Sequence, residues 1–235
     1  MKTILTSGLA QLCLDTPPQA ADQLAQYGQM LLEKNQVMNL TAIREPEQVA
    51  RLHMLDCAAL AGLVDLKGKT LIDVGTGAGF PGLPLKILVP SLELTLLDSL
   101  NKRLDWLEEV AGTLRLEGVR TVHARAEEQA LVKGFRDSFD FATARAVADL
   151  RILCELCLPY VRPGGTFLAM KSTSSDQELT EAAHAIQLLG GRVREVRDYT
   201  IPGTDVIHRV VLIQKVAPTL KGYPRRWAKI QKAPL

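Results

Sequence analysis

The sequence of 235 residues lacks any apolar run long enough to cross a membrane or to form an export signal. Residues 1–14 form an apolar stretch that polar residues interrupt, which is a poor match to the core of a signal peptide. The most apolar run, residues 82–89, contains Pro84 and Lys86, whereas a membrane span needs about 18 consecutive apolar residues. We therefore expect a soluble cytoplasmic protein without membrane contact.

Cysteine is also scarce. The four cysteines, Cys13, Cys57, Cys154 and Cys157, are unevenly spaced, which does not resemble a disulfide framework and suits a reducing compartment. Cys154 and Cys157 match the CxxC pattern, but a structural zinc needs four ligands and a redox pair favours a helix N-terminus after a strand. Because the pair falls within the apolar helical stretch 150–158, we interpret both as reduced core cysteines and predict no metal site.

Acidic residues are absent from residues 215–235, where six of the 28 basic residues lie. The other 22 basic residues face 26 acidic ones, so residues 1–214 carry a formal charge of −4. A cationic tail that also contains Tyr223 and Trp227 can bind phosphates by charge while its rings stack on bases. The alternative is a disordered end that only increases solubility.

The chain is long enough, and with 47% apolar residues apolar enough, for one well-buried domain with a smaller appendage. The first 66 residues contain no convincing strand, and helical patterns begin at Pro18 and Pro46. We predict an N-terminal helical cap over residues 1–66, a ligand-binding domain over residues 67–214 and a basic tail over residues 215–235.

From Lys69 onward, short apolar runs alternate with amphipathic segments, which is typical of a parallel sheet covered by helices on both faces. Two later runs, Val193–Tyr199 and Val206–Gln214, have no helix-length segment between them and should pair antiparallel. The expected fold class is therefore α/β, with a doubly wound, mostly parallel sheet that ends in an antiparallel hairpin and carries an N-terminal helical extension.

A glycine-rich turn follows the strand expected over Thr70–Val74. Gly75, Gly77 and Gly79 can adopt backbone angles closed to other residues, let a ligand approach the main chain and begin a helix that favours negative charge. Asp73, at the end of the strand, is placed either to organise this turn or to meet a cationic group of a ligand.

The same turn also contains a GxGxxG match from Gly77 to Gly82, so a nicotinamide-dependent oxidoreductase is an alternative. In a dinucleotide-binding fold the first glycine follows the strand almost at once, and here Gly75 already occupies that place. The rest of the chain offers no evident catalytic His–acid pair or zinc set.

Acidic residues stand where the next two strands end. Asp98 lies 25 residues after Asp73, where an acid accepts hydrogen bonds from a ribose diol, or where it caps the helix expected from Asn101. Glu127 and its neighbour Ala126 follow the third strand, where the edge of an adenine would lie.

Basic residues end the following two strands. Arg145 follows Phe139–Ala144 and Lys171 follows Thr166–Met170, so both fall on the sheet edge where open α/β folds bind ligands. His53 and Asp56 are three residues apart on an expected helix and share one face, which makes them candidates for a pocket wall.

Together these motifs resemble the RsmG family of bacterial small-subunit ribosomal RNA methyltransferases, also called glucose-inhibited division protein B, from about Asn35 to Gln214. The chain departs from the family at Cys57, where a small residue such as Ser is common, and at residues 228–232, where longer members often have a Gly-Thr/Ile-Pro-x-Lys pattern. The resemblance is carried by Met38-Asn39-Leu40-Thr41 with Arg44, His53-Met-Leu-Asp56, Asp73-Val-Gly-Thr-Gly-Ala-Gly-Phe-Pro-Gly82, Leu97-Asp98-Ser99-Leu100, Ala126-Glu127, Ala144-Arg145-Ala146 and Met170-Lys171.

The resemblance implies a class I, Rossmann-like methyltransferase with S-adenosylmethionine as methyl donor. The implied acceptor is N7 of one guanine in the 530 loop of 16S rRNA (position 527 in the usual rRNA numbering), in the small ribosomal subunit or its precursor. A non-catalytic RNA-binding protein with the same fold is a third possibility, and we expect a monomer. The expected cofactor contacts are Asp73, Gly75, Gly77, Gly79, Phe80, Asp98, Ser99, Leu100, Ala126, Glu127 and Arg145, and the expected catalytic donors to guanine O6 are Asn39, Arg145 and Lys171.

Overall fold

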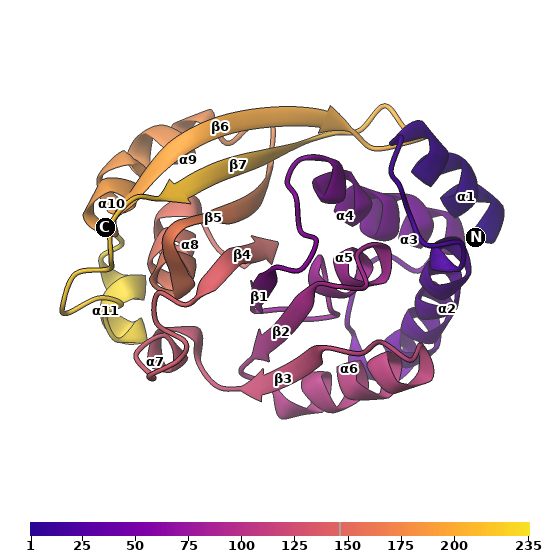
Figure 1. The fold of residues 1–235 in the computed structure, drawn as a ribbon, viewed down its shortest axis with the longest axis horizontal. Coiled ribbons are helices and arrows are strands. Elements are labelled where there is room, and N and C mark those ends of the chain that lie inside the picture. The colour runs from indigo at the N-terminus through magenta and orange to yellow at the C-terminus, as the bar shows by residue number, and fades with distance from the viewer. Residues whose placement is uncertain (146) are drawn as a thin grey trace.

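The computed structural model describes residues 1–145 and 147–235, which include a single seven-stranded sheet in the order β3-β2-β1-β4-β5-β7-β6 (Figure 1). The strands are β1 (Thr70–Val74), β2 (Glu93–Asp98), β3 (Val119–His123), β4 (Phe139–Arg145), β5 (Val161–Ser172), β6 (Gly191–Thr200) and β7 (Ile207–Lys215). The helices are α1 (Lys2–Gln11), α2 (Ala20–Met38), α3 (Pro46–Val49), α4 (Asp56–Ala59), α5 (Gly82–Leu88), α6 (Asn101–Thr113), α7 (Ala126–Gln129), α8 (Leu150–Cys157), α9 (Asp176–Glu181), α10 (Ala183–Leu188) and α11 (Trp227–Lys232). A π-helical segment spans Ala50–Leu55, and 3-10 turns span Leu60–Gly62 and Leu158–Tyr160.

The sheet has the predicted mixed character. Strands β1 to β5 pair in parallel, because helical segments intervene between them, and β7 pairs antiparallel with both β5 and β6. Only six residues separate β6 from β7, too few for the crossover that a parallel pair requires. The predicted α/β fold with its terminal hairpin is confirmed.

Neighbouring residues of β1 point to opposite faces of the sheet. Leu71 joins the core that α2, α5 and α6 cover, whereas Ile72 joins the core under α8, α10 and α11. The two groups of helices lie on either side of the sheet in Figure 1.

The N-terminal helices complete the first of these cores. Leu5 and Leu9 of α1 and Leu24 of α2 are buried in the same apolar cluster as Leu71 of the sheet. No strand forms within residues 1–66, as expected, whereas α1 was not among the expected elements. The helical region therefore shares its interior with the sheet, and its boundary at residue 66 stays a prediction.

The basic tail is folded, so the disordered alternative is wrong. Ile230 of α11 is buried in the core under α8. Arg225 forms an ion pair of 2.6 Å with Glu155, and Lys215 forms one of 2.8 Å with Asp137. Two of the six cations of the tail are thus neutralised within the protein, which reduces the positive charge that it offers to phosphates.

Among the described helices, none combines the length with the apolar character that a membrane span requires.

Candidate functional site

A cavity of about 560 Å³ opens at the carboxyl ends of β1, β2 and β4. This is the sheet edge at which open α/β folds bind ligands. Of the expected cofactor contacts, the cavity is lined by Gly75, Gly77, Phe80, Asp98, Ser99, Ala126, Glu127 and Arg145. Asp73, Gly79 and Leu100 are not part of its lining, so any contribution that they make to this cavity is indirect.

The glycine-rich turn is shaped by hydrogen bonds to the end of β2. Gly75 has a φ of +70° and its N–H donates to the carbonyl of Leu97 at 2.9 Å. A side chain at Gly75 would put its Cβ 3.1 Å from Val147. Gly79 faces away from the cavity, where a Cβ would approach Leu107 to 2.8 Å. Gly75 therefore keeps the cavity open, whereas Gly79 allows the turn to pack on the core.

Asp73 organises the turn from beneath. Its side chain is fully buried, and Oδ2 accepts hydrogen bonds from the Thr76 hydroxyl at 2.7 Å and from the Gly82 N–H at 3.0 Å. Oδ1 is buried without a hydrogen-bond partner among the described residues. Burial raises the pKa of Asp73 to about 6, although these two hydrogen bonds oppose the shift. Of the two expected roles for Asp73, the structure favours organisation of the turn.

Asp98 ties the second strand to the turn. Its carboxylate accepts hydrogen bonds from the N–H groups of Gly77 and Leu100, each at 2.9 Å, and lies 3.3 Å from Arg103. The N-cap of α6 is Leu100, which has no side-chain cap, so Asp98 holds the residues before the helix. Leu100 is 43% exposed and takes part through its backbone.

Glu127 is a buried residue that lines the cavity. The side chain is 5% exposed and makes no hydrogen bond to another described residue. Because the residue lines the cavity, a ligand that carries N–H groups can donate to this carboxylate. Ala126, Leu156 and Trp227 lie beside it in the cavity lining. Trp227 belongs to the tail and was expected to stack on RNA bases rather than to line this cavity.

Arg145 and His53 form a wall of the cavity next to the turn. Its guanidinium donates hydrogen bonds to Asp56 Oδ2 at 3.2 Å and to His53 Nδ1 at 3.0 Å, and it lies 4.8 Å from the ring centre of Phe80. Arginine cannot accept a hydrogen bond, so Nδ1 is unprotonated and Nε2–H of His53 donates to Thr41 Oγ1 at 2.8 Å. Burial, together with the charge of Arg145, lowers the pKa of His53 to about 4. The wall therefore contains a neutral imidazole.

Asp56 connects this wall to the hairpin. It is 1% exposed, and Oδ1 accepts hydrogen bonds from the Tyr199 hydroxyl and from His208 Nδ1, both at 2.8 Å. The spacing of His53 and Asp56 did indicate a shared helix face. Tyr199 and His208 pair across β6 and β7, and no motif in the sequence singled them out.

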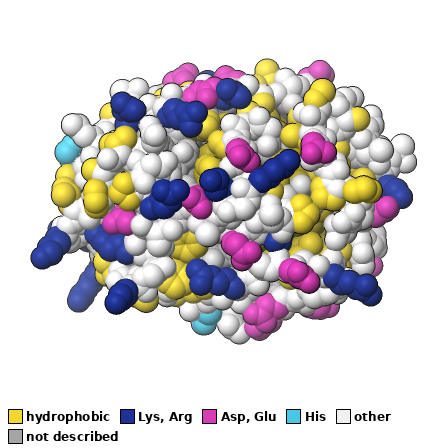
Figure 2. All heavy atoms as spheres, viewed as in Figure 1, with side chains coloured by type: hydrophobic (Ala, Val, Ile, Leu, Met, Phe, Trp, Pro, Cys, Tyr) yellow, Lys and Arg dark blue, Asp and Glu magenta, His cyan; other side chains and the backbone are white. Residues whose placement is uncertain are grey.

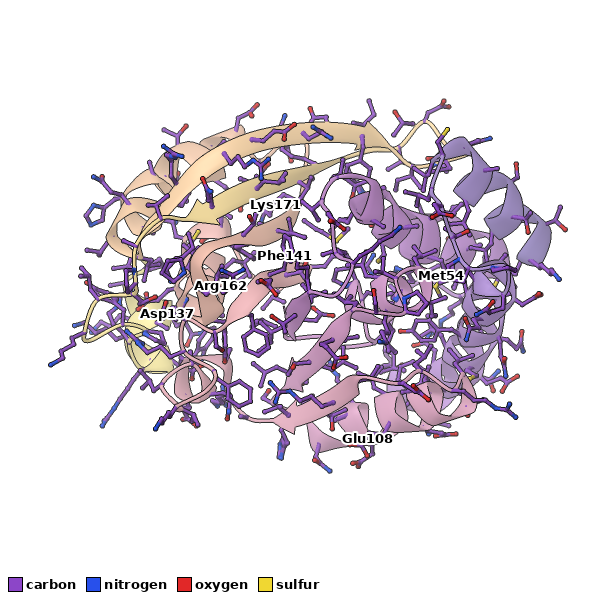
Figure 3. All side chains as sticks on the ribbon, in the orientation of Figure 1. Met54, Glu108, Asp137, Phe141, Arg162 and Lys171 are labelled. Carbon is purple, nitrogen blue, oxygen red and sulfur yellow. The ribbon has the colours of Figure 1, made fainter. Side chains whose placement is uncertain are left out.

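A second cavity of about 360 Å³ lies on the other side of His53 and Arg145, and both residues line the two cavities. Lys171, labelled in Figure 3, lines the second cavity only, where its Nζ is 2.6 Å from Glu178 Oε2. Asn39 lines neither: it is the exposed, left-handed C-cap of α2. Of the three expected catalytic residues, Arg145 and Lys171 are therefore brought near one another and Asn39 is not.

A sequence model of the family described as rRNA small subunit methyltransferase G matches residues 20–205. The chain belongs to this family. A ribosomal RNA small subunit methyltransferase G from Lachnoclostridium phytofermentans is 46% identical over 97% of this chain and 95% of its own length. The methyltransferase G of Alkaliphilus metalliredigens is 45% identical and covers 100% of this chain and 98% of its own.

The solved structures agree on the fold. A SAM-dependent O-methyltransferase from Thermotoga maritima has a TM-score of 0.53 and 19% identity to this chain, and the match covers 81% of this chain and 73% of the other. The membership in the methyltransferase G family and the Rossmann-like fold are thus confirmed.

Proposed function

We propose that this member of the methyltransferase G family transfers a methyl group from S-adenosylmethionine to N7 of a guanine in the 530 loop of 16S rRNA, in the small subunit or its precursor. The observation that carries the proposal is the pair of cavities that share His53 and Arg145 as a common wall. One cavity has the groups that a nucleoside cofactor needs, and the other adjoins it where an acceptor must lie.

The first cavity fits an adenosyl cofactor. The carboxylate of Glu127 has no donor among the described residues, which suits the amino group of adenine, and Trp227 and Leu156 add apolar surface to the same cavity lining. Asp98 stands at the end of β2, where it would accept from a ribose diol. S-Adenosylmethionine held there would supply a methyl group on a sulfonium. The Thermotoga maritima protein of the same fold is itself a SAM-dependent enzyme.

The wall residues suit a reaction without a general base. Guanine N7 carries a lone pair and no proton at neutral pH, so the acceptor does not have to be deprotonated. His53 already has its ring nitrogens engaged by Arg145 and Thr41, and Arg145 can stabilise charge only as a donor. Catalysis would then rest on holding the base in an attacking position and on donors aimed at its O6.

RNA binding is consistent with the charge distribution. Figure 2 shows Lys and Arg side chains scattered among acids over the face in view, with several at the end where α11 lies. The nicotinamide-dependent alternative receives no support from the family or the fold. A non-catalytic RNA-binding protein would bind S-adenosylhomocysteine and yet leave ribosomal RNA unmethylated.

The proposal is tested by mass spectrometry of 16S rRNA from cells that contain the protein and from cells that lack it. We expect one methylated guanine in the 530 loop that disappears with the protein and returns when purified protein and S-adenosylmethionine are added. An unchanged methylation pattern would refute the proposed function. Methyl transfer within twofold of wild type in both R145A and K171A would refute the roles of those side chains.

A further inference from the structure

The second cavity pairs Lys171, the expected donor to O6, with a carboxylate that the proposed reaction has not used. Lys171 of β5 and Glu178 of α9 face one another across 2.6 Å, and both line this cavity beside Met170 and His208. Its volume of about 360 Å³ falls in the range of small-molecule sites. We propose that this cavity is the subsite for the acceptor base and that Glu178 and Lys171 read the edge of guanine. The inference rests on the proposed function.

The pair offers a donor and an acceptor side by side. Glu178 Oε2 accepts a hydrogen bond at 3.0 Å from the N–H of Leu150 and forms an ion pair with Lys171 Nζ. Oε1 makes no hydrogen bond to another described residue, and the side chain of Glu178 is 34% exposed. Lys171 donates one hydrogen bond, to the carbonyl of Ala148 at 3.2 Å, so its ammonium group keeps a further N–H beside the ion pair with Glu178. Each partner thus keeps one free hydrogen-bonding group.

Guanine presents the complementary order. Its O6 is an acceptor and the adjacent N1–H and N2–H groups are donors, so O6 would meet Lys171 while N1–H and N2–H meet Glu178. Adenine has the reverse order on the same edge, with an amino donor where guanine has O6 and a bare N1 acceptor beside it. In this cavity adenine would set a donor against Lys171 and a lone pair against Glu178, so the pair favours guanine.

The same arrangement directs N7 toward the cofactor. Along the rim of guanine the polar groups follow the order N2, N1, O6 and N7. A base whose first three groups face Glu178 and Lys171 turns N7 toward the wall of His53 and Arg145, beyond which lies the first cavity. Glu178 and Lys171 would therefore contact the recognised edge of the base, while N7 faces the wall of His53 and Arg145. Both contacts are possible for a base that a single-stranded loop inserts into the cavity.

Hypoxanthine separates the two contacts, because it keeps O6 and N1–H but lacks the N2 amino group of guanine. We would measure single-turnover methyl transfer to small subunits reconstituted with guanine or hypoxanthine at the acceptor position. Wild type should prefer guanine by about tenfold or more, the usual size of a lost hydrogen bond to a charged group. In E178Q the amide oxygen stays on Lys171 and the Leu150 N–H, and the amide N–H2 then faces the base. Transfer to guanine should fall by at least about tenfold, and the preference should shrink to within threefold.

Two further variants make the result specific. K171M should slow both substrates by a similar factor and keep the preference, because both bases have O6. E181Q is the matched control, since Glu181 lies on the same helix and pairs with Arg151 at 3.3 Å outside the cavity. S-Adenosylhomocysteine affinity and the melting temperature show that each variant is folded.

A wild-type preference retained in folded E178Q, or wild-type rates in K171M, would overturn the subsite. If E178Q does not fold, K171M alone decides by the same criterion. If the wild-type protein methylates N7 of neither the guanine nor the hypoxanthine, the proposed function itself is refuted, so the two failures are distinguishable.

Discussion

Arg145 donates a hydrogen bond to His53 Nδ1 at 3.0 Å, and this pair forms the wall between the two cavities. The contact fixes the tautomer of the imidazole, and the ion pair with Asp56 fixes the guanidinium in turn. His53 also stacks on Phe80, with ring centres 4.7 Å apart, so the wall is continuous with the glycine-rich turn. A substitution of His53 or Arg145 should therefore alter both cavities.

Replacement of Arg145 by lysine should disable the wall while it retains the positive charge. Lysine lacks the planar fork that reaches Asp56 and His53 together, so we expect methyl transfer to fall by at least about tenfold. R162K is the matched control, because Arg162 makes a half-exposed ion pair with Asp140. Transfer rates in a single-turnover assay give the comparison, and R145K at a rate within twofold of R162K would contradict the prediction.

The pKa values of His53 and His208 should be shifted in opposite directions from the ordinary value for histidine. Burial and Arg145 lower the pKa of His53 to about 4, whereas the hydrogen bond to Asp56 raises that of His208 above 6.5. NMR titration of the ring protons, assigned with single variants, measures both values. Equal pKa values for the two rings would show that the network does not form in solution.

The same shifts set a pH dependence of stability. The unfolded chain binds a proton at His53 more tightly than the folded one, so this contribution is present above pH 6.5 and is lost as the pH falls through about 4. For His208 the folded state binds the proton more tightly, so its contribution is present below pH 6.5 and is lost as the pH rises through the raised pKa. In H208Q the free energy of unfolding should lose the second dependence and keep the first. A full alkaline decline in H208Q would assign that decline to another group.

Gly75 and Gly112 form a matched pair for the turn. G75A must place a side chain at a φ of +70° with its Cβ 3.1 Å from Val147, so we expect weaker binding of S-adenosylhomocysteine. Gly112 lies in α6 with nothing within 4 Å of the added carbon, so G112A should stabilise the fold by about 0.4–1 kcal/mol and leave binding unchanged. Calorimetric titration and thermal unfolding measure the two effects. Equal affinities of G75A and G112A for S-adenosylhomocysteine would show that the turn is not part of the binding site.

The fluorescence of Trp227 should report ligand binding in the first cavity. The other tryptophan, Trp106, is 2% exposed in the core, so a change of emission on adding S-adenosylhomocysteine should come from Trp227. W227L should abolish that change and raise the dissociation constant about threefold to tenfold, the value of an aromatic stacking contact. Y223F is the control, because it keeps the backbone carbonyl that accepts from Arg136. An unchanged affinity of W227L for S-adenosylhomocysteine would show that Trp227 does not contact the ligand.

The strand ends were the part of the site that sequence could place. Because parallel strands end at one edge, Asp98, Glu127 and Arg145 had to meet there once the alternation of strands and helices was recognised. Lys171 ends the next strand, but β5 lies one position farther along the sheet, and its side chain faces the neighbouring cavity. Leu100 belongs to a motif of the family resemblance, but only its backbone N–H takes part, as the donor to Asp98.

The remaining contacts depend on tertiary packing that no local pattern encodes. His208 reaches Asp56 only because the hairpin lies against the π-helical segment and α4 that follows it, and the two residues are 152 positions apart. Trp227 reaches the first cavity because buried Glu155 holds Arg225 and because Ile230 fits under α8. The charge and aromatic content of this tail did not indicate where it docks on the domain, and its predicted binding to RNA stays a prediction.

Trp227 follows every described strand in chain order, so the cavity wall that it supplies is made after the sheet has been synthesised. A nascent polypeptide thus acquires the glycine-rich turn and Glu127 before it acquires the indole that completes the lining of this cavity. Translation past α11, followed by its docking, sets the moment at which the enclosure is complete.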